Sequence, residues 1–322
     1  MVLFILFFGT LAWKNFSLAL NFTVFALPAY LIRFSFGELP YTMLSVMIWT
    51  LFFVYLVCLW KKRGGMQGFR EWIRHPSKEH LSLRLAIGLF FISACIAVFV
   101  SPLRDDALIA WKAYFLEPIL FFIMIATTVR TRKDVRMVLF SMGLSLLAVT
   151  LVGVFQKFTA WKLDPLYMVG GKVDRITSVY GFPNAIGLYF GPIIALFTGW
   201  MWSTLRSLQR HARSHTRGKN VVRNVLLLWF QVLVIFSGIL ALVLAQSEGA
   251  LVAVFVAFVC LGLFAPQWRS KLITALIVLI VCVGIWSQPE LKNYMSAKLT
   301  FSTWSEQVRL SIWKESWQLV LA

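Results

Sequence analysis

Long apolar stretches separated by short polar segments dominate the pattern of this chain. A helix that crosses a bilayer needs roughly 20 mostly apolar residues, and about nine stretches come close to that length. These predicted spans lie near residues 17–33, 40–60, 84–101, 107–128, 137–156, 183–205, 225–245, 249–265 and 271–287. Because a backbone in lipid must satisfy its own polar groups, the pattern predicts an all-α, polytopic transmembrane helical bundle of about nine spans, with short extracytoplasmic amphipathic helices.

Composition agrees with this interpretation, since 60% of the residues are hydrophobic and the mean hydropathy is +0.79. We expect residues 1–322 to form a single membrane domain in which 288–322 begin an extracytoplasmic loop. The apolar start, Met1–Trp13, lacks a basic leading segment and a small-residue cleavage site, so it is a poor signal peptide. It is interpreted as a hydrophobic lead-in or as part of a first helix.

The net charge of +18 is unevenly distributed along the chain. Four gaps between spans hold 19 of the 31 Lys and Arg residues: 61–84, 129–136, 206–223 and the gap after 265. All four lie on one side if the nine spans alternate, and retention of positive charge predicts that this side is the cytoplasm. The basic stretches have no interleaved aromatic residues and the chain has no glycine-rich phosphate loop, so nucleic acid is excluded as a partner and membrane lipid is expected instead.

Cysteine and histidine positions argue against metal chemistry. The four cysteines fall inside apolar runs without a CxxC pair, which predicts buried small hydrophobes rather than a disulfide or zinc site: Cys58, Cys95, Cys260 and Cys282. The four histidines all lie in the predicted cytoplasmic gaps: His75, His80, His211 and His215. Histidine-dependent chemistry is therefore not expected on the opposite face within these residues, and no metal site is predicted.

The segment 157–187 is the richest candidate for extracytoplasmic chemistry. Gly170-Gly171 and Phe182-Pro183-Asn184 indicate turns, and the second of these opens the next predicted span. The start of that helix would then carry Asn184 and Tyr180 beside Arg175 and Lys172. Cationic residues at a helix N-terminus favour a phosphate or pyrophosphate ligand. The alternative is that these residues anchor the helix end among lipid head groups.

The tail, 299–322, is predicted to form an amphipathic helix. Thr303 and Glu306 make a capping-box pattern. Four apolar residues follow at helical spacing, with Arg309 bordering them: Leu310, Trp313, Trp317 and Val320. Such a helix would lie in the membrane interface with Arg309 against phosphates. The alternative is a solvated face with a salt bridge between Glu306 and Arg309.

Glu117 is an ionisable residue inside a predicted span. Such residues are costly in lipid, so Glu117 is a candidate functional residue. The alternative is a structural role as the partner of Lys112 or Arg104, which lie near the same predicted edge of the membrane.

Several segments together resemble the O-antigen ligase / O-antigen polymerase superfamily of membrane glycosyltransferases. The resemblance spans nearly the whole chain. It is carried by Pro28–Phe34 with Pro40, by Lys112–Pro118, by Asp174–Gly187, by Ser247–Ala250 and by Val308–Trp317.

The resemblance implies transfer of a glycan from a polyprenyl-pyrophosphate carrier on the extracytoplasmic face of the bacterial plasma (inner) membrane. The acceptor would be lipid A core sugar, another glycan or a protein, and the inverting mechanism would need neither metal nor cofactor. Arginines would hold the pyrophosphate, and a histidine in a large periplasmic loop would be the base. Arg309 matches the arginine that opens this loop, so it is the predicted catalytic residue. Arg175 matches the basic position before Pro-Asn; Lys172, Asn184, Tyr180 and Glu117 join it as predicted substrate-binding residues.

Two departures from the family pattern bear on activity. Glu248 stands where many members carry an arginine, and residues 1–322 include no histidine at the catalytic position. The resemblance therefore implies a truncated fragment that is inactive alone. Two other hypotheses stay open: a transporter or flippase of lipid-linked sugars, and a non-catalytic membrane protein of the envelope.

Overall fold

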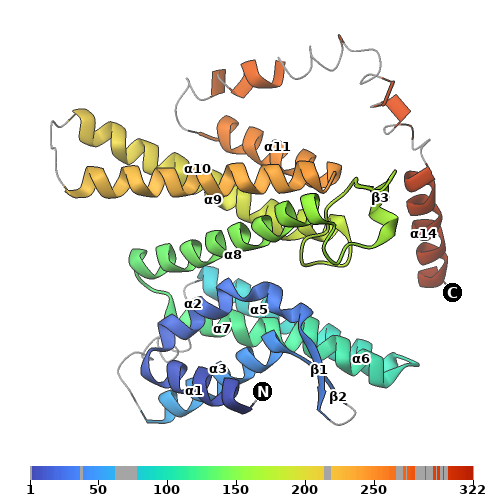
Figure 1. The fold of residues 1–322 in the computed structure, drawn as a ribbon. Coiled ribbons are helices and arrows are strands. Elements are labelled where there is room, and N and C mark those ends of the chain that lie inside the picture. Colours follow the sequence, from blue (N-terminus) through green and yellow to red (C-terminus); the bar gives the residue numbers. More distant parts are fainter. Residues whose placement is uncertain are drawn as a thin grey trace. The chain divides into compact units, whose positions relative to one another are not determined.

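The computed structural model describes residues 2–36, 39–61, 78–213 and 219–265, and toward the C-terminus 271–272, 274–279, 287, 293–294, 296–297, 300 and 304–321. The chain divides into two compact units, Met1–Val252 and Ala253–Ala322, and each is described by itself. The described residues are overwhelmingly helical (Figure 1).

The helices of the first unit, with α11 continuing into the second, are α1 (Val2–Lys14), α2 (Phe16–Phe25), α3 (Met43–Trp60), α5 (Lys78–Val100), α6 (Arg104–Trp111), α7 (Glu117–Thr128), α8 (Arg132–Thr159), α9 (Pro183–Arg213), α10 (Lys219–Leu244) and α11 (Glu248–Leu263). Short helical turns are η1 (Leu27–Leu31), the π-helical η2 (Lys112–Leu116) and η3 (Pro165–Tyr167). Two antiparallel hairpins pair β1 (Arg33–Phe36) with β2 (Leu39–Thr42), and β3 (Met168–Val169) with β4 (Lys172–Val173). The second unit contains α14 (Trp304–Leu321).

Six described helical segments are long and apolar enough to cross a membrane: 43–60, 81–100, 104–128, 132–159, 183–210 and 221–244. They correspond to six of the nine predicted spans, and they make this a helical protein of the multi-pass membrane type. Large apolar side chains on their outer faces are exposed, for example Leu89 and Phe99 on α5. Such a broad apolar surface is expected where lipid rather than water surrounds the protein.

Two predicted spans differ from the structure, and a third falls largely outside it. The stretch 17–33 is divided between α2, η1 and the first residue of β1. The α-helix ends here because Pro28 has no N–H to donate and its ring clashes with the preceding turn. The stretch 249–265 forms α11, a 16-residue apolar helix that is shorter than the six long segments. Most of 271–287 lies outside the described residues.

The span predicted at 40–60 begins three residues later than expected. Pro40 lies in β2, opposite Ser35 of β1, an edge position that a residue without an N–H tolerates. The helix α3 starts only after Thr42, whose side chain accepts a hydrogen bond from the Ser45 N–H at 3.1 Å. Thr42 thereby caps the helix N-terminus.

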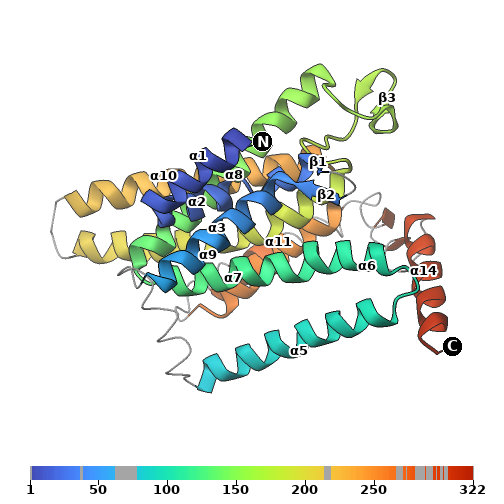
Figure 2. The same ribbon diagram turned by 90° about the horizontal axis from the view of Figure 1, so that it is seen from below.

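Contacts inside the first unit set the direction of its helices. Ser45 of α3 contacts Glu117 of α7. Ten residues further along each of these helices, the hydroxyls of Tyr55 and Thr127 are 2.9 Å apart. The helices α3 and α7 therefore run parallel, so the basic gaps that follow them start at the same end of the unit. The hairpins β1–β2 and β3–β4 lie at the opposite end in both views (Figures 1 and 2).

Small residues allow α8, α9 and α10 to pack closely. A Cβ atom on Gly143 would lie 2.8 Å from the rings of Phe197 and Phe230, and one on Gly238 would lie 2.8 Å from Ile194. The first helices form a second core around Phe8, Leu20, Met47, Leu51 and Met124, all nearly inaccessible.

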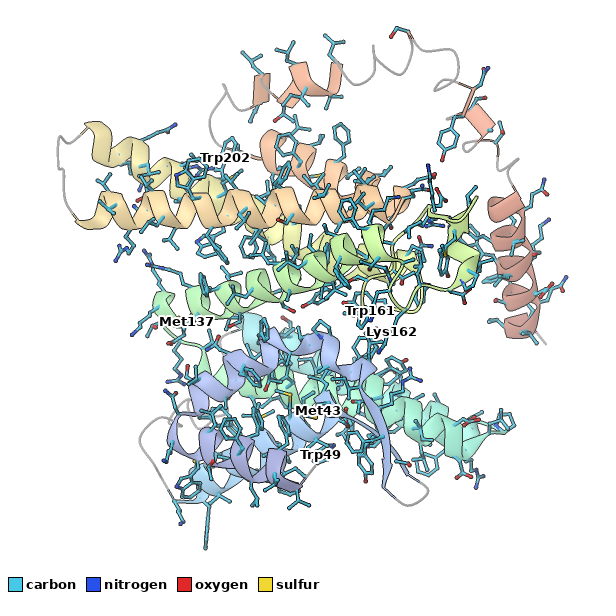
Figure 3. All side chains as sticks on the ribbon, in the orientation of Figure 1. Met43, Trp49, Met137, Trp161, Lys162 and Trp202 are labelled. Carbon is cyan, nitrogen blue, oxygen red and sulfur yellow. The ribbon has the colours of Figure 1, made fainter. Side chains whose placement is uncertain are left out.

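Figure 3 shows Trp161 and Lys162 near β3, and Met137 toward the other end of α8.

Not all cysteines match the prediction of buried hydrophobes. Cys58 is buried, whereas Cys95 is half-buried and Cys260 is exposed on α11. An exposed cysteine on an apolar helix is consistent with a surface that meets lipid, and the prediction for Cys260 is wrong because burial was inferred from the apolar run alone. Cys282 lies outside the described residues, as do His75 and His215.

Candidate functional site

The loop between α8 and α9 is fastened to the end of α8 by Gln156. This side chain is fully buried. Its Oε1 atom accepts hydrogen bonds from the backbone N–H groups of Thr177 and Ser178, both at 2.8 Å, and its Nε2 atom donates to the Trp161 carbonyl at 3.2 Å. One amide side chain therefore satisfies polar groups of the loop that would otherwise be buried without partners.

Ser178 completes this attachment. Its backbone is left-handed, with φ of 55°, a conformation that a side chain disfavours unless contacts hold it. The Ser178 hydroxyl donates to the Val149 carbonyl at 2.6 Å, and Gly153 leaves space for Ile176 against α8. The loop residues just before α9 are thus positioned by the rigid end of a long helix.

Lys157, one residue further along α8, positions the hairpin β3–β4. Its Nζ atom donates to the carbonyls of Val173 at 2.5 Å and Asp174 at 3.1 Å. The hairpin turns at Gly170 and Gly171, which have φ values of 56° and 75°, as type I′ turns require. The predicted turn at these two glycines is present.

Arg175 joins the loop to α9 and to the end of α10. Its Nε atom donates to the Ala245 carbonyl at 3.0 Å, and its Nη2 atom donates to Asn184 Oδ1 and to the Gln246 carbonyl, both at 3.3 Å. Asn184 stands in the first turn of α9, and Ala245 and Gln246 directly follow α10. The structure therefore places Arg175 next to both Asn184 and the end of α10.

The three oxygens that accept hydrogen bonds from Arg175 are all neutral. The Asp174 carboxylate, next in the chain, instead accepts a hydrogen bond from Gln246 Nε2 at 3.0 Å. Arg175 is partly exposed, so its positive charge is fixed in direction but open to an anion on the outside. A more modest role is also consistent with these contacts, because a cation at a helix C-terminus satisfies the last carbonyls and the helix dipole.

Tyr180 lies beneath this surface and Lys172 lies on it. The Tyr180 side chain is 6% exposed, and its ring centroid is 6.4 Å from that of Tyr30 and 6.3 Å from that of Tyr189. Burial raises the pKa of the Tyr180 phenol, and the neighbouring Tyr189 and Tyr30 raise it further, so the group stays a neutral hydrogen-bond donor. Lys172 is exposed in β4.

Tyr189 continues the row of tyrosines into α9. Its hydroxyl is 2.7 Å from the Ser145 hydroxyl of α8. A row of aromatic rings therefore leads from η1, through Tyr180, to the packed interface of α8 and α9. Aromatic faces with hydroxyl groups suit contact with a sugar or with the edge of a lipid head group.

Glu117 belongs to a second cluster, formed with residues of α3. The Ser45 hydroxyl and the Trp49 indole both donate to Glu117 Oε1, the latter at 3.0 Å. Lys112 Nζ lies 3.8 Å from the same oxygen and 4.0 Å from the centroid of the Tyr41 ring. The structural alternative predicted for Glu117, a pairing with Lys112, is confirmed.

These contacts fix the position of the Glu117 side chain. Two hydrogen-bond donors and one cation converge on a single carboxylate oxygen of a residue that is 6% exposed. All three contacts are made to the same oxygen, so they tie the Glu117 side chain to α3 and to Lys112.

Arg309 lies on α14, in the second unit, and its side chain is exposed. The predicted helix is present, and the apolar residues predicted for its stripe include Trp313, Trp317 and Val320, all more than half exposed. Arg309 and Lys314 border this stripe on its two sides by helical spacing. Thr303 and the side chain of Glu306 lie outside the described residues, and so does the predicted capping box.

Sequence reasoning did not single out Gln156 or Gln246 as parts of this site, and it included Lys157 only as the first residue of the segment 157–187. The available signal was a pair of polar residues, Gln156 and Lys157, in the last turn of an otherwise apolar helix. Within the described parts of the chain, no group of three or more His, Cys, Asp and Glu residues is placed to hold a metal ion.

Comparison of the chain with protein-family models, with curated proteins and with solved structures finds no match.

Proposed function

We propose that this chain is an O-antigen ligase-like membrane glycosyltransferase, which moves a glycan from a polyprenyl-pyrophosphate carrier to an acceptor on the extracytoplasmic face of the bacterial plasma membrane. The observation that carries the proposal is the placement of Arg175. Its guanidinium is held by three hydrogen bonds to neutral oxygens. It lies at the end of the first unit that carries the hairpin β3–β4, opposite the basic gaps.

A fixed guanidinium suits the leaving group of this reaction. Negative charge grows on the pyrophosphate oxygens as the bond to the sugar breaks, and a preorganised cation near a low-dielectric surface stabilises that charge without having to reorient. The planar fork of arginine also fits phosphate oxygens in pairs. In this proposal Arg175 and Lys172 bind the pyrophosphate and Asn184 donates a hydrogen bond to phosphate or sugar. Tyr180, predicted from the sequence as a further substrate-binding residue, is buried beneath this surface and packs against Tyr30 and Tyr189 instead.

Arg309 and Glu117 have different parts in the proposal. Arg309 is proposed as a cation of the transfer step on the strength of the family resemblance, and α14 would hold it in the membrane interface with its tryptophans in lipid. Glu117 acts through Lys112, which it keeps at the outer end of α3. By the family resemblance, a histidine of a large periplasmic loop would accept the proton of the acceptor hydroxyl.

The proposed topology extends the six long helices to about nine crossings. The basic gaps then face the cytoplasm, and the loop 160–182 faces outward. The two additional crossings beyond the first helices are α11 and the stretch 271–287. Fusion of a reporter active only in the periplasm after residue 165, and of a second reporter after residue 131, tests this orientation directly.

Binding of undecaprenyl pyrophosphate to the purified chain in nanodiscs tests the role of Arg175. The variant Arg175→Gln should bind about 10–100-fold more weakly, which corresponds to the loss of one or two charge-assisted hydrogen bonds. The variant Arg175→Lys should recover only part of this affinity, because a lysine lacks the planar fork. Binding of undecaprenol, which has no phosphate, should not change.

The matched control is Arg104→Gln, which removes an exposed arginine from the start of α6. Thermal unfolding of each variant separates a binding defect from a loss of structure, because Arg175 also ties α9 to the end of α10. Equal affinities for the Arg175→Gln and Arg104→Gln variants, with both proteins folded, would exclude Arg175 from the pyrophosphate site.

The transport hypothesis finds less support among the described residues. Some buried polar groups within the long helices pair with each other, as Gln231 Nε2 does with the Thr204 hydroxyl at 3.1 Å and the Ser145 hydroxyl with that of Tyr189 at 2.7 Å. A transporter needs such groups to line a path near the bilayer centre. Scrambling of lipid-linked sugars by the purified protein in liposomes would nevertheless favour transport, and a phenotype that survives replacement of both Arg175 and Arg309 would favour a non-catalytic role.

A further inference from the structure

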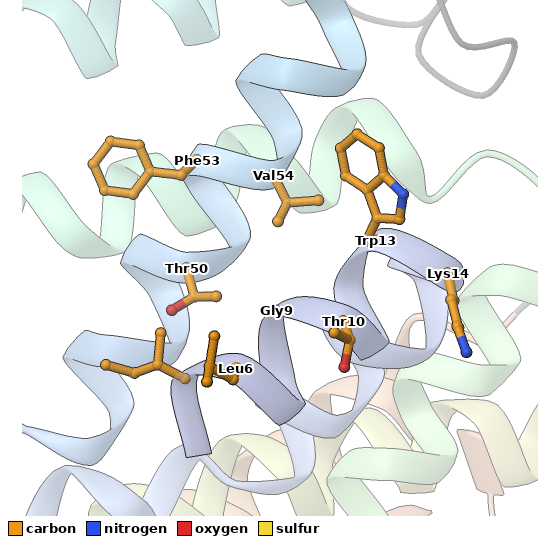
Figure 4. A pocket seen from close by; sticks show the side chains of 9 residues that line it. Leu6, Gly9, Thr10, Trp13, Lys14, Thr50, Phe53 and Val54 are labelled. Carbon is orange, nitrogen blue, oxygen red and sulfur yellow. The ribbon is translucent and has the colours of Figure 1, made fainter. Parts of the chain in front are cut away.

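A groove runs along the outer side of α1 and α3, away from the candidate site. Its volume is about 430 Å³, within the range of roughly 300–1,000 Å³ seen for small-molecule sites. Figure 4 shows side chains of both helices around it. The lining residues are Ile5, Leu6, Gly9, Thr10, Trp13, Lys14, Thr50, Phe53 and Val54.

The groove exists because one face of α1 is buried and the other is open. Phe8 and Ala12 are fully buried in the core, whereas Leu6 and Phe53 on the groove side are each 60% exposed. Gly9 contributes no side chain at the centre, where a Cβ atom would lie 3.7 Å from Thr50 Cγ2. The floor of the groove is therefore a glycine, and its walls are apolar.

One end of the groove is cationic. Lys14, the last residue of α1, belongs to the lining. Lys61, directly after α3, holds its Nζ atom 5.1 Å from the centroid of the Trp13 ring, which also lines the groove. The helices α1, α2 and α3 contain no Asp or Glu residue. The two lysines thus present positive charge beside an apolar channel.

We propose that this groove binds one anionic glycerophospholipid. An acyl chain lies over Gly9, between Leu6 and Phe53, and the phosphate lies between Lys14 and Lys61. The apolar walls suit a hydrocarbon chain, since each buried methylene group favours binding. The two cations select a head group that carries a net negative charge.

The position of the lysines identifies the source of this lipid. Lys61 follows the end of α3 that is remote from Ser45 and Glu117, and it opens one of the basic gaps. A resident lipid of the leaflet that contacts the basic gaps fits this end. A polyprenyl-pyrophosphate donor would place its charge at the other end, near Arg175, so the lipid site is independent of the proposed transfer reaction.

The test measures the lipids that remain bound to the full chain by native mass spectrometry after delivery from mixed vesicles of dioleoyl phosphatidylglycerol and dioleoyl phosphatidylcholine. The wild-type protein should retain phosphatidylglycerol about tenfold or more over phosphatidylcholine, since each lysine near an anionic surface contributes about fivefold. The double variant Lys14→Gln/Lys61→Gln should lose most of this preference. The double variant Arg132→Gln/Lys133→Gln, which removes two exposed charges from the start of α8, should keep it.

A second pair of variants tests the groove itself. Gly9→Leu fills the channel without forcing the backbone apart, because the added Cβ has ordinary contacts, and it should reduce the retained lipid at least fivefold. Gly88→Leu makes the same change on α5, where a Cβ meets nothing within 4 Å, and should have no effect. The proposal is overturned if Gly9→Leu and Gly88→Leu retain lipid equally, or if the Lys14→Gln/Lys61→Gln variant keeps the preference for phosphatidylglycerol.

Discussion

Lys112 and Glu117 form an ion pair although they are five residues apart in one helical segment, with Lys112 Nζ lying 3.8 Å from Glu117 Oε1. In a regular α-helix the residues that face each other are three or four apart. The π-helical turn η2 allows the longer spacing, because its hydrogen bond joins the Glu117 N–H to the Lys112 carbonyl. Pro118 follows at once and cannot continue an unbroken α-helical ladder, which gives the turn a physical cause.

Neutralising Glu117 should destabilise the protein. In Glu117→Gln the shape is kept, but the buried cluster loses the charge that Lys112, Ser45 and Trp49 converge on. We expect a loss of about 1–3 kcal/mol in the free energy of unfolding, measured by thermal or denaturant unfolding in detergent. The control Asp105→Asn, at an exposed position of α6, should be neutral. Equal stability of the two variants would mean that the Lys112–Glu117 pair contributes nothing.

Removing the amide of Gln156 should release the loop between α8 and α9. In Gln156→Leu the N–H groups of Thr177 and Ser178 lose their shared acceptor, at a cost of roughly 2 kcal/mol or more. Trypsin should then cleave more rapidly at Lys162, Lys172 and Arg175. Mass spectrometry of a digestion time course identifies the cleavage sites. Phe158→Leu, which alters an 84% exposed side chain of the same helix turn, should leave the cleavage rate unchanged.

Two glycines one helical turn apart in α9 should respond oppositely to alanine. A Cβ atom on Gly187 would overlap Ser247 Oγ and lie 2.7 Å from Ala250 Cβ, whereas one on Gly191 meets nothing within 4 Å. Gly187→Ala should therefore cost about 1–3 kcal/mol through overpacking, while Gly191→Ala should stabilise by up to about 1 kcal/mol. Melting temperatures of the two purified variants compare them directly. A neutral Gly187→Ala would contradict the close packing of α9 on the segment Ser247–Ala250.

In the proposed reaction, Arg309→Ala should abolish glycan transfer while leaving membrane insertion intact. A fixed cation that acts on the leaving group is worth about a hundredfold or more in rate. Arg309 is exposed on α14, so its removal should not affect folding. Lys314→Ala, on the other border of the same apolar stripe, is the matched control. Transfer at the wild-type rate in the Arg309→Ala variant would remove Arg309 from the mechanism.

Local signals in the sequence predicted much of the architecture. Six predicted spans coincide with long helices, α9 begins at Pro183 as expected, and Gly170-Gly171 forms the predicted turn. A contact of Glu117 with Lys112 or Arg104 was one of two predicted interpretations, and the structure shows the contact with Lys112; the functional interpretation of Glu117 stays a prediction. Each of these features depends on neighbouring residues, which is why a single sequence contains the information.

Features that join distant segments could not be predicted in this way. The carbonyls that hold Arg175 belong to residues about 70 positions further along the chain, and Ser45 is 72 residues from Glu117. The break between α2 and η1 and the short length of α11 were not predicted either, because the prediction of spans used only the length of each apolar stretch. The roles proposed for the candidate site residues stay predictions, and the experiments on Arg175 and Arg309 test two of them.

Apolar helices suited to a membrane follow from the sequence, because the free energy of transferring each stretch into lipid depends on the length and composition of that stretch. The pairing of polar groups follows only from the packed fold: Gln156 with Thr177 and Ser178, Arg175 with Asn184, and Glu117 with Ser45. Those contacts depend on how helices pack and on which direction each side chain takes. Packing of that kind is a property of the assembled bundle and not of any one stretch.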